Sequence, residues 1–227
     1  MRHRTSGGLI GYYHRRHGET GRERFTITHH ADGARTLRAL CEMDDDEVLR
    51  DVTFSLAPDW RPLDAFIRLT VGDRFVGSAW FRFHARGAEC QSFTAAEGRA
   101  DQRVEMDHWP PYFGTHSLIT DGWHAAFWRD DGPSEQVLQT LVCSHAANGA
   151  TGPALSAGTA RLALLGSGRL RVPAGEFDAR HFTVKFGSFE VPMHFWTIAD
   201  DDHQVLRIEW DHLDAYYELL EFERSRG

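Results

Sequence analysis

The chain has 227 residues, of which 41% are hydrophobic and 26% are charged, and its formal net charge is -8. An acidic chain repels the phosphate backbone, which argues against a nucleic-acid partner, and no apolar stretch approaches the roughly 20 residues that a membrane span needs. The N-terminal residues contain no apolar run of signal-peptide length, so we expect a cytoplasmic protein. The length suits one β-rich domain over residues 1–227, with pseudo-halves 1–108 and 129–227 as the alternative division.

Short runs with period-two alternation, separated by turn residues, fill the first half and are typical of antiparallel strands. Asp32-Gly33 and Gly72-Asp73 lie between such runs and predict hairpins, because an Asp-Gly pair supplies the positive φ of a tight turn. The predicted strands of this half are residues 8–17, 23–30, 35–43, 48–57, 63–71, 74–84, 88–95 and 99–106.

The pattern changes at residues 109–128, WPPYFGTHSLITDGWHAAFW, where aromatic residues, two histidines and an aspartate lie without alternation. Thr115 follows a glycine and is a candidate helix cap, so we expect a short helix or an irregular crossover here. Alternation then resumes, around a loop at 149–158. The predicted strands of this half are residues 136–146, 159–165, 168–173, 177–186, 189–199, 203–211 and 215–222.

These elements predict a mainly β fold. We expect a single curled antiparallel sheet of about a dozen strands, closed into a barrel or half-barrel, with the crossover against its open side.

The last third of the chain carries a resemblance. RVPAGEFDARHFTV (171–184) and FEVPMHFWTIADDDHQVLRIEWDHLDAYYELLEF (189–222) share a plan of VPAG, a strand, W-x-x-x-D before a turn, then LRIE and a final Y-x-L. This plan resembles the closing hairpins of an uncharacterised bacterial domain family that is related in shape to lipoprotein carriers and lipocalins. The resemblance implies a concave sheet around an apolar cavity, and it supplies no catalytic residue.

The crossover holds the strongest candidates for chemistry. On a helix, His116, Thr120 and His124 recur at four-residue spacing and share one face. Asp121 lies three residues before His124, near enough to orient its imidazole, as a general base requires. The alternative is that these polar groups contact backbone at the mouth of a barrel.

The strands add further candidates. Lys185 is the only lysine among 25 basic residues. In a cavity it would have a lowered pKa and act as a base or form a Schiff base, whereas on the outer surface it would have no such role. His194 is the predicted second acid–base group. The predicted binding residues are side chains expected to line a cavity: Tyr12, Trp80, Arg82, Trp123, Trp196 and Trp210.

Other site classes find little support. Cys41, Cys90 and Cys143 are widely spaced and form no CxxC pair, which favours free buried thiols over a zinc site or disulfides. The chain has no GxSxG elbow, phosphate loop or GxGxxG pattern. His116 and His124 are too far apart for an HExxH site, although a cross-strand histidine trio stays open. We expect neither an organic cofactor nor a metal.

Three hypotheses follow. The first is an enzyme that works without an organic cofactor, a lyase acting on carbon–carbon or carbon–oxygen bonds or an isomerase, which uses acid–base chemistry on a hydrophobic, aromatic small molecule. The second is a non-catalytic, lipocalin-like carrier of a lipid or hydrophobic metabolite. The third is a homodimer held together by exposed aromatic residues. Two titratable side chains that converge on one bound atom would favour the enzyme.

Overall fold

The computed structural model describes residues 4–187 and 189–225, and fifteen strands within them form one sheet. The strands are β1 (Arg4–His14), β2 (Gly18–His29), β3 (Arg35–Met43), β4 (Val48–Leu56), β5 (Pro62–Val71), β6 (Arg74–His84), β7 (Gly87–Thr94), β8 (Gly98–Glu105), β9 (Tyr112–Gly114), β10 (Gln136–Val142), β11 (Ser156–Val172), β12 (Gly175–Phe186), β13 (Met193–Ile198), β14 (Val205–Trp210) and β15 (Ala215–Arg224).

The sheet is a meander with one long-range join. Its order runs from β8 back to β1, continues through β15, and then runs back from β14 to β9. Every neighbouring pair is antiparallel except β9 and β10, which are parallel. The sheet therefore has two edges, β8 and β9, and stays open between them. The prediction of a mainly β, barrel-like sheet with one short helix is confirmed, with more strands than expected.

Two local features differ from the predicted strands. The predicted strands 159–165 and 168–173 are one long strand, β11, in which the register shifts between Leu164 and Gly166 and leaves Leu165 as a bulge. Strand β9 has only three residues, too few to show alternation. The hairpin turns were predicted well, since Gly33, Gly72 and Asp73 all have the positive φ expected of them.

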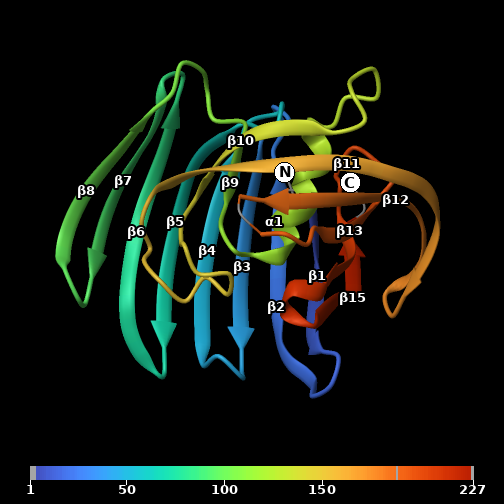
Figure 1. Cartoon of the computed structure of the whole chain (residues 1–227), viewed down its shortest axis with the longest axis horizontal. Coiled ribbons are helices and arrows are strands. Elements are labelled where there is room, and N and C mark those ends of the chain that lie inside the picture. The colour runs from blue at the N-terminus through green and yellow to red at the C-terminus, as the bar shows by residue number, and fades with distance from the viewer. Residues whose placement is uncertain (1–3, 188, 226–227) are drawn as a thin grey trace.

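The sheet curls over a short helical segment. In Figure 1, β2–β6 form one layer, and the long strands β11 and β12 cross in front of it with α1 between the layers. Helix α1 (Leu118–Asp121) continues into the 3-10 helix η1 (Gly122–Phe127), and a further 3-10 turn, η2 (Asp211–Leu213), precedes β15. The N-cap is Ser117 rather than the predicted Thr115.

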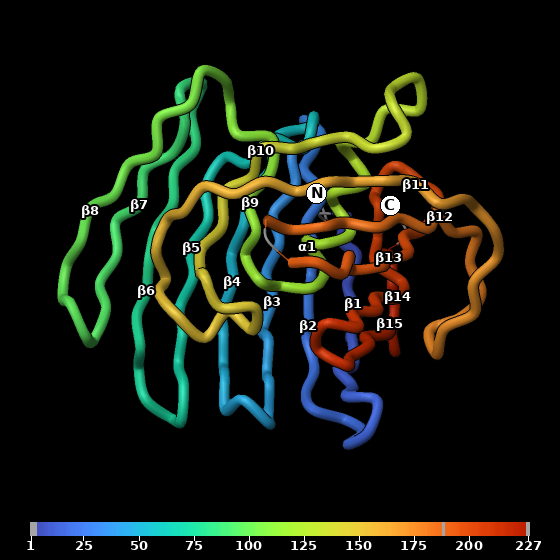
Figure 2. Tube along the Cα trace, viewed as in Figure 1, coloured from blue at the N-terminus to red at the C-terminus, as the bar shows by residue number. Residues whose placement is uncertain are grey.

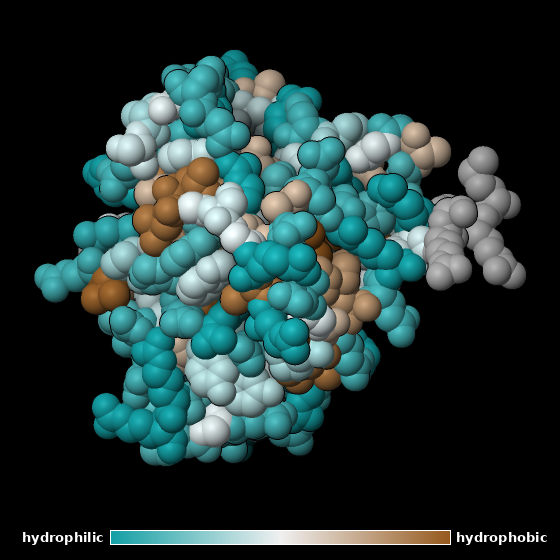
Figure 3. All heavy atoms as spheres, turned by 90° about the vertical axis from the view of Figure 1, so that its right-hand side faces the viewer, coloured by the Kyte–Doolittle hydropathy of each residue, from teal (hydrophilic) through white to brown (hydrophobic). Residues whose placement is uncertain are grey.

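The core lies inside the curl. Buried side chains such as Phe54, Phe81, Phe182 and Phe195 come from the inward-facing positions of strands in both layers, which Figure 2 traces along the chain. The outward-facing positions are largely polar, and Figure 3 shows a mostly hydrophilic face on which hydrophobic side chains form separate patches. In the described part of the chain, no helix has the length and apolar character needed to cross a membrane.

Candidate functional site

A cavity of about 550 Å³ lies between the crossover segment and the curled sheet. This volume is within the range of small-molecule sites in proteins. Its wall combines polar groups with aromatic rings from six positions, which are Tyr12, Tyr112, Phe186, Phe189, Trp210 and Tyr217. The predicted residues that line it are Tyr12, His116, Asp121 and Trp210.

Glu23 fixes the helical segment that carries Asp121. Its side chain is fully buried on β2, where the alternation places it on the same face as Phe25. The carboxylate accepts hydrogen bonds from the Ser117 hydroxyl at 2.8 Å and from the backbone amides of Leu118 at 2.7 Å and Ile119 at 3.0 Å. These amides belong to the first turn of α1 and have no partner within the helix, so a strand side chain caps the helix.

The same carboxylate also organises one end of the cavity. The Tyr12 hydroxyl donates to Glu23 at 2.9 Å, and the Cys41 thiol donates to it at 3.4 Å. Burial, followed by the charge of Glu23, raises the pKa of Tyr12 well above its ordinary value. Tyr12 is therefore a neutral hydrogen-bond donor at neutral pH, and its ring stays in the wall as the sequence predicted.

Asp121 ends α1 and borders the cavity. The Tyr112 hydroxyl lies 3.3 Å from both its Oδ1 atom and the Thr120 carbonyl, so it shares its proton between them. Burial, and then the charge of Glu23, raise the pKa of Asp121 to about 8, against the opposing effect of the Tyr112 hydrogen bond. A carboxyl with this pKa is mostly protonated at pH 7 and can donate a proton.

Tyr217 completes this end of the cavity from β15. Its ring packs edge-on against Tyr12, with 5.2 Å between the ring centroids. Burial raises the pKa of Tyr217, and the charges of Asp121 and Asp46 raise it further. Two tyrosine hydroxyls and the Asp121 carboxyl are therefore all in their neutral, proton-bearing forms at neutral pH.

The predicted helical face of His116, Thr120 and His124 is wrong. His116 precedes the helix and has a φ of 56°, a left-handed conformation that breaks the helical spacing. It lines the cavity, where Nε2 donates to the Ser144 carbonyl at 3.3 Å. Burial and the nearby Arg50 charge lower the pKa of His116 to about 4, so the imidazole is neutral.

His124 is fully buried behind the cavity and is not part of its lining. Its Nδ1 atom donates to the Asp121 carbonyl at 2.8 Å, so the backbone of Asp121 sets the tautomer and the predicted carboxylate–imidazole pair is wrong. The ring packs on Tyr112, tilted by 31° with 3.7 Å between centroids, and burial lowers the pKa of His124 to about 4. This geometry makes His124 a support for Tyr112 rather than a base in contact with a ligand.

Arg50 is a further buried charge that sequence reasoning missed. Only 1% of its surface is exposed, and its guanidinium donates to the carbonyls of His116 at 2.8 Å and Asn148 at 3.0 Å. It thereby joins the start of the crossover to the loop after β10. The sequence pattern could have indicated both Arg50 and Glu23. Each is a charged residue at a position where the alternation of its strand places side chains on the apolar face.

Trp80 and Arg82 do not line the cavity, contrary to the prediction. Both lie on the outer face of β6, where Trp80 is 40% exposed. The Arg82 guanidinium lies over the Trp80 ring, 5.3 Å from its centroid, which partly covers the exposed indole. The inner face of β6 holds the buried Phe81 and Phe83.

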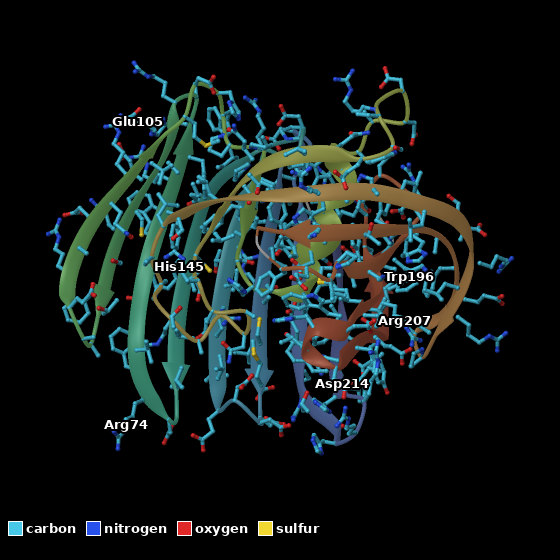
Figure 4. All side chains as sticks on the ribbon, viewed as in Figure 1. Arg74, Glu105, His145, Trp196, Arg207 and Asp214 are labelled. Carbon is cyan, nitrogen blue, oxygen red and sulfur yellow. The ribbon has the colours of Figure 1, made fainter. Side chains whose placement is uncertain are left out.

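Lys185, His194 and Trp196 also lie away from the cavity lining, on the opposite face from the buried Val184 and Phe195. Trp196 stacks on His181 with 3.9 Å between the ring centroids, and His194 Nδ1 is 3.0 Å from His181 Nε2. Figure 4 shows Trp196 beside Arg207, its cross-strand partner. His181, His194 and Trp196 form an outer cluster, and neither this cluster nor Lys185 lines the cavity with Asp121.

The crossover contributes side chains both to the core and to the cavity wall, and Trp123 belongs to the core. It is 2% exposed and packs against Phe54 and Trp60, with centroids 6.0 Å and 5.5 Å away, so it belongs to the core and not to the predicted binding wall. Tyr112 and Asp121 face the cavity from the same segment. The crossover therefore fills part of the core with Trp123 and forms part of the cavity wall with Tyr112 and Asp121.

All three cysteines are free and buried. Among the described residues, no group of three or more histidine, cysteine, aspartate or glutamate side chains has a geometry that could hold a metal ion.

Comparison with solved structures supports the fold. The chain is similar to a beta-barrel-like protein of the domain of unknown function DUF1849 from Brucella abortus, with a TM-score of 0.57, 10% identity and coverage of 100% of both chains. It is also similar to a DUF1089 family protein from Pseudomonas aeruginosa, with a TM-score of 0.44, 8% identity and coverage of 81% of this chain and 87% of that one. No family model and no curated protein matches the sequence. The first likeness spans the whole chain, well beyond the C-terminal third.

Proposed function

We propose that the protein is an enzyme that uses acid–base chemistry on a hydrophobic small molecule bound in the cavity, with Asp121 as its proton donor and no organic cofactor. One observation carries this proposal: a carboxyl group with a pKa near 8 borders a cavity of about 550 Å³. A general acid is most effective when its pKa lies near the working pH.

The neighbours of Asp121 suit a reversible proton transfer. When Asp121 gives its proton to an oxygen or an unsaturated carbon of the ligand, the resulting carboxylate accepts a stronger hydrogen bond from Tyr112. The charge of Glu23 opposes that carboxylate and favours its reprotonation as the product forms. In an isomerase, Asp121 protonates one carbon of a double bond and its carboxylate then takes a proton from an adjacent carbon, which moves the double bond. In a lyase, Asp121 protonates the leaving oxygen and its carboxylate takes the proton from the neighbouring carbon. The acid is restored in both cases.

Tyr12, Tyr217 and His116 are positioning groups in this proposal. Each borders the cavity in a neutral form and can hydrogen-bond to a ligand without competing for the Asp121 proton. Tyr217 carries a hydroxyl near Asp121 and is the second titratable group that converges on the same region.

A carrier is the second candidate function. Six aromatic rings in the cavity wall favour apolar contact with a ligand, and a lipocalin-like role needs only that contact. Both functions predict a bound hydrophobic molecule, and only the enzyme predicts exchange of protons with it.

Deuterium exchange separates the two. Native mass spectrometry first identifies the hydrophobic molecule that copurifies with the protein. The protein and this molecule are then incubated in D₂O, and the mass of the extracted molecule is measured by mass spectrometry at successive times. The enzyme incorporates deuterium at carbon, and Asp121→Asn stops this incorporation. Asp51→Asn, on an exposed position of β4, is the matched control and keeps the wild-type rate. Equal incorporation in wild type and Asp121→Asn would remove Asp121 from the chemistry, and no incorporation in either protein would leave the carrier.

A further inference from the structure

Strand β8 leaves a long edge of the sheet unpaired. Within the described residues it pairs only with β7, and Figure 1 shows no element beyond it at the margin of the molecule. The outward-directed N–H and C=O groups of its backbone therefore have no neighbouring strand to bond to. The opposite edge, β9, has three residues, whereas β8 has eight and pairs with β7 without a register shift. A regular edge of this length can pair with a strand of a second molecule.

The exposed side chains of β8 alternate in charge. Every second residue of the strand is exposed, and these four residues carry positive, negative, positive and negative charge in order: Arg99, Asp101, Arg103 and Glu105. The half-buried residues between them are uncharged: Gly98, Ala100, Gln102 and Val104. Charged edges usually prevent sheets from joining, because a run of one sign repels a second copy. The alternating order has the opposite effect, since it becomes its own complement when the strand is reversed.

One antiparallel register between two β8 strands brings opposite charges together at every exposed position. A two-fold axis at Gln102 places Arg99 opposite Glu105 of the partner subunit. It also places Asp101 opposite Arg103 of the partner subunit, and the symmetry repeats both pairs. A register shifted by one residue would oppose exposed charges to half-buried positions, and a shift by two would oppose like charges. The charge order therefore specifies this register.

Within one molecule these charges have only weak partners. Arg99 lies 3.6 Å from Asp101, and Arg103 contacts both Glu105 and Glu89, the latter at 3.6 Å. The four charged side chains of β8 are between 55% and 74% exposed. Exposed ion pairs contribute little because water and salt screen them. Each group can therefore take a partner across an interface without losing a strong contact.

We propose that the protein forms a two-fold symmetric homodimer, in which the β8 strands of two molecules pair antiparallel about Gln102 and join their sheets into one. The interface consists of backbone hydrogen bonds between the two edges, with cross-strand ion pairs on the outer face. It differs from the aromatic interface expected from the sequence, because the exposed Trp80 lies on β6, two strands from this edge. The dimer goes beyond the proposed function and involves no residue of the cavity lining.

Sedimentation velocity of the full chain over a range of concentrations tests the dimer. We expect a monomer–dimer equilibrium with a Kd on the order of 10 µM, because an interface of one strand pair is small. Raising the ionic strength from about 0.05 M to about 0.5 M is expected to weaken the dimer about 5-fold, since salt screens exposed ion pairs. A chain that stays monomeric at about 200 µM would overturn the inference.

Two double variants test the charge order at constant composition, because each exchanges two residues of the strand. Arg103→Glu with Glu105→Arg gives the order positive, negative, negative, positive. This order opposes like charges across the axis, and we expect dimerisation to be at least about 10-fold weaker. Asp101→Arg with Arg103→Asp gives positive, positive, negative, negative, which is again its own complement, and we expect an affinity within about 3-fold of wild type. Equal affinities of the two variants would overturn the proposed register. All the exchanged positions are exposed, so both variants should keep the fold, which circular dichroism checks.

Hydrogen–deuterium exchange of the backbone assigns the dimer to this edge. Amides of β8 should exchange more slowly as the protein concentration rises through the Kd, while amides of β9 should not respond. Arg103→Glu with Glu105→Arg should abolish the response of β8. A dimer that leaves β8 unprotected, or one that protects β9 instead, would overturn the inference. These measurements do not involve Asp121, so the dimer and the proposed function stand or fail separately.

Discussion

The buried carboxylate of Glu23 accepts a hydrogen bond from the hydroxyl of Ser117, 94 residues further along the chain, at 2.8 Å. This contact joins the second strand to the crossover. Because Glu23 also accepts the amides of Leu118 and Ile119, one strand side chain sets where the helical turn begins and where Asp121 ends it.

We expect Glu23→Gln to lower the free energy of unfolding by about 3 kcal/mol, since the neutral amide loses charge-assisted hydrogen bonds and turns its own donors toward other donors. Urea denaturation followed by tryptophan fluorescence measures the change. Glu223→Gln, at an exposed position of β15, is the control and should stay within about 0.5 kcal/mol of wild type. Equal effects of the two substitutions would contradict a capping role for Glu23.

The pKa of Asp121 gives stability a dependence on pH. It is raised from the ordinary 3.8 to about 8, so the folded state holds a proton that the unfolded state releases between these values. The resulting stabilisation is fully present below about pH 4 and is lost as the pH rises through 8. We expect the difference in unfolding free energy between wild type and Asp121→Asn to fall across this window and to level off above it. A difference that is flat with pH would show that Asp121 has an ordinary pKa.

The buried histidines act in the opposite direction. The pKa values of His116 and His124 are lowered from 6.5 to about 4. Between these pH values both histidines are protonated in the unfolded state and neutral in the folded state. The stability they contribute is present above pH 6.5 and is lost as the pH falls to 4, by up to about 3 kcal/mol for each group. We expect His124→Phe to weaken this acid dependence in urea denaturation between pH 4 and 7. If the loss of unfolding free energy between pH 7 and pH 4 is the same in wild type and His124→Phe, then His124 is protonated in the folded state.

Two tryptophans offer a matched test of core and surface. Trp123→Ala removes a ring that packs on Phe54 and Trp60, and we expect it to cost about 4 kcal/mol because the core cannot close over the space. Trp80→Ala, on the outer face of β6, should cost less than about 1 kcal/mol. Thermal unfolding ranks the two variants, and a larger effect at Trp80 would reverse our assignment of the sheet faces.

The loop after β10 requires glycine at position 149, because a side chain there would clash with its neighbours. Gly149 has a φ of 67°, and a Cβ atom there would lie 2.1 Å from an Arg50 Nη2 atom and 2.9 Å from the His116 Cβ atom. We expect Gly149→Ala to displace the guanidinium and to cost at least about 2 kcal/mol more than Gly18→Ala. Gly18 also has a positive φ, but its added Cβ would meet nothing within 4 Å. Similar costs at both positions would show that only backbone conformation matters.

Alternation of apolar and polar residues predicted the strands well. Because the sheet curls around one core, most strands have one face buried in it and one face exposed. Alternation placed 35–43 and 74–84 at their observed bounds. It failed at Leu165, where a bulge changes the phase of β11 without ending the strand. A bulge depends on the neighbouring strand, which local sequence does not specify.

The candidate site was harder to predict than the sheet. Tyr12 and Asp121 were found, but Tyr217 was missed, because it reaches the cavity only through the pairing of β1 with β15. Trp80 was misplaced because a polar outer face and a polar cavity lining have the same pattern along one strand. The contact between Glu23 and Ser117 depends on how the crossover folds over the sheet. The spacing of residues along the sequence does not predict that arrangement.

The pairing of β1 with β15 is the one place where neighbouring strands are far apart in the chain, with Thr5 and Ser225 hydrogen-bonded across a separation of 220 residues. The two unpaired edges, β8 and β9, are instead consecutive in sequence. A circularly permuted chain, with β15 linked directly to β1 and new termini opened between β8 and β9, would add each strand to the one just before it. Its loop-closure entropy would be much smaller, so such a permutant should reach the same sheet faster than the natural order of strands does.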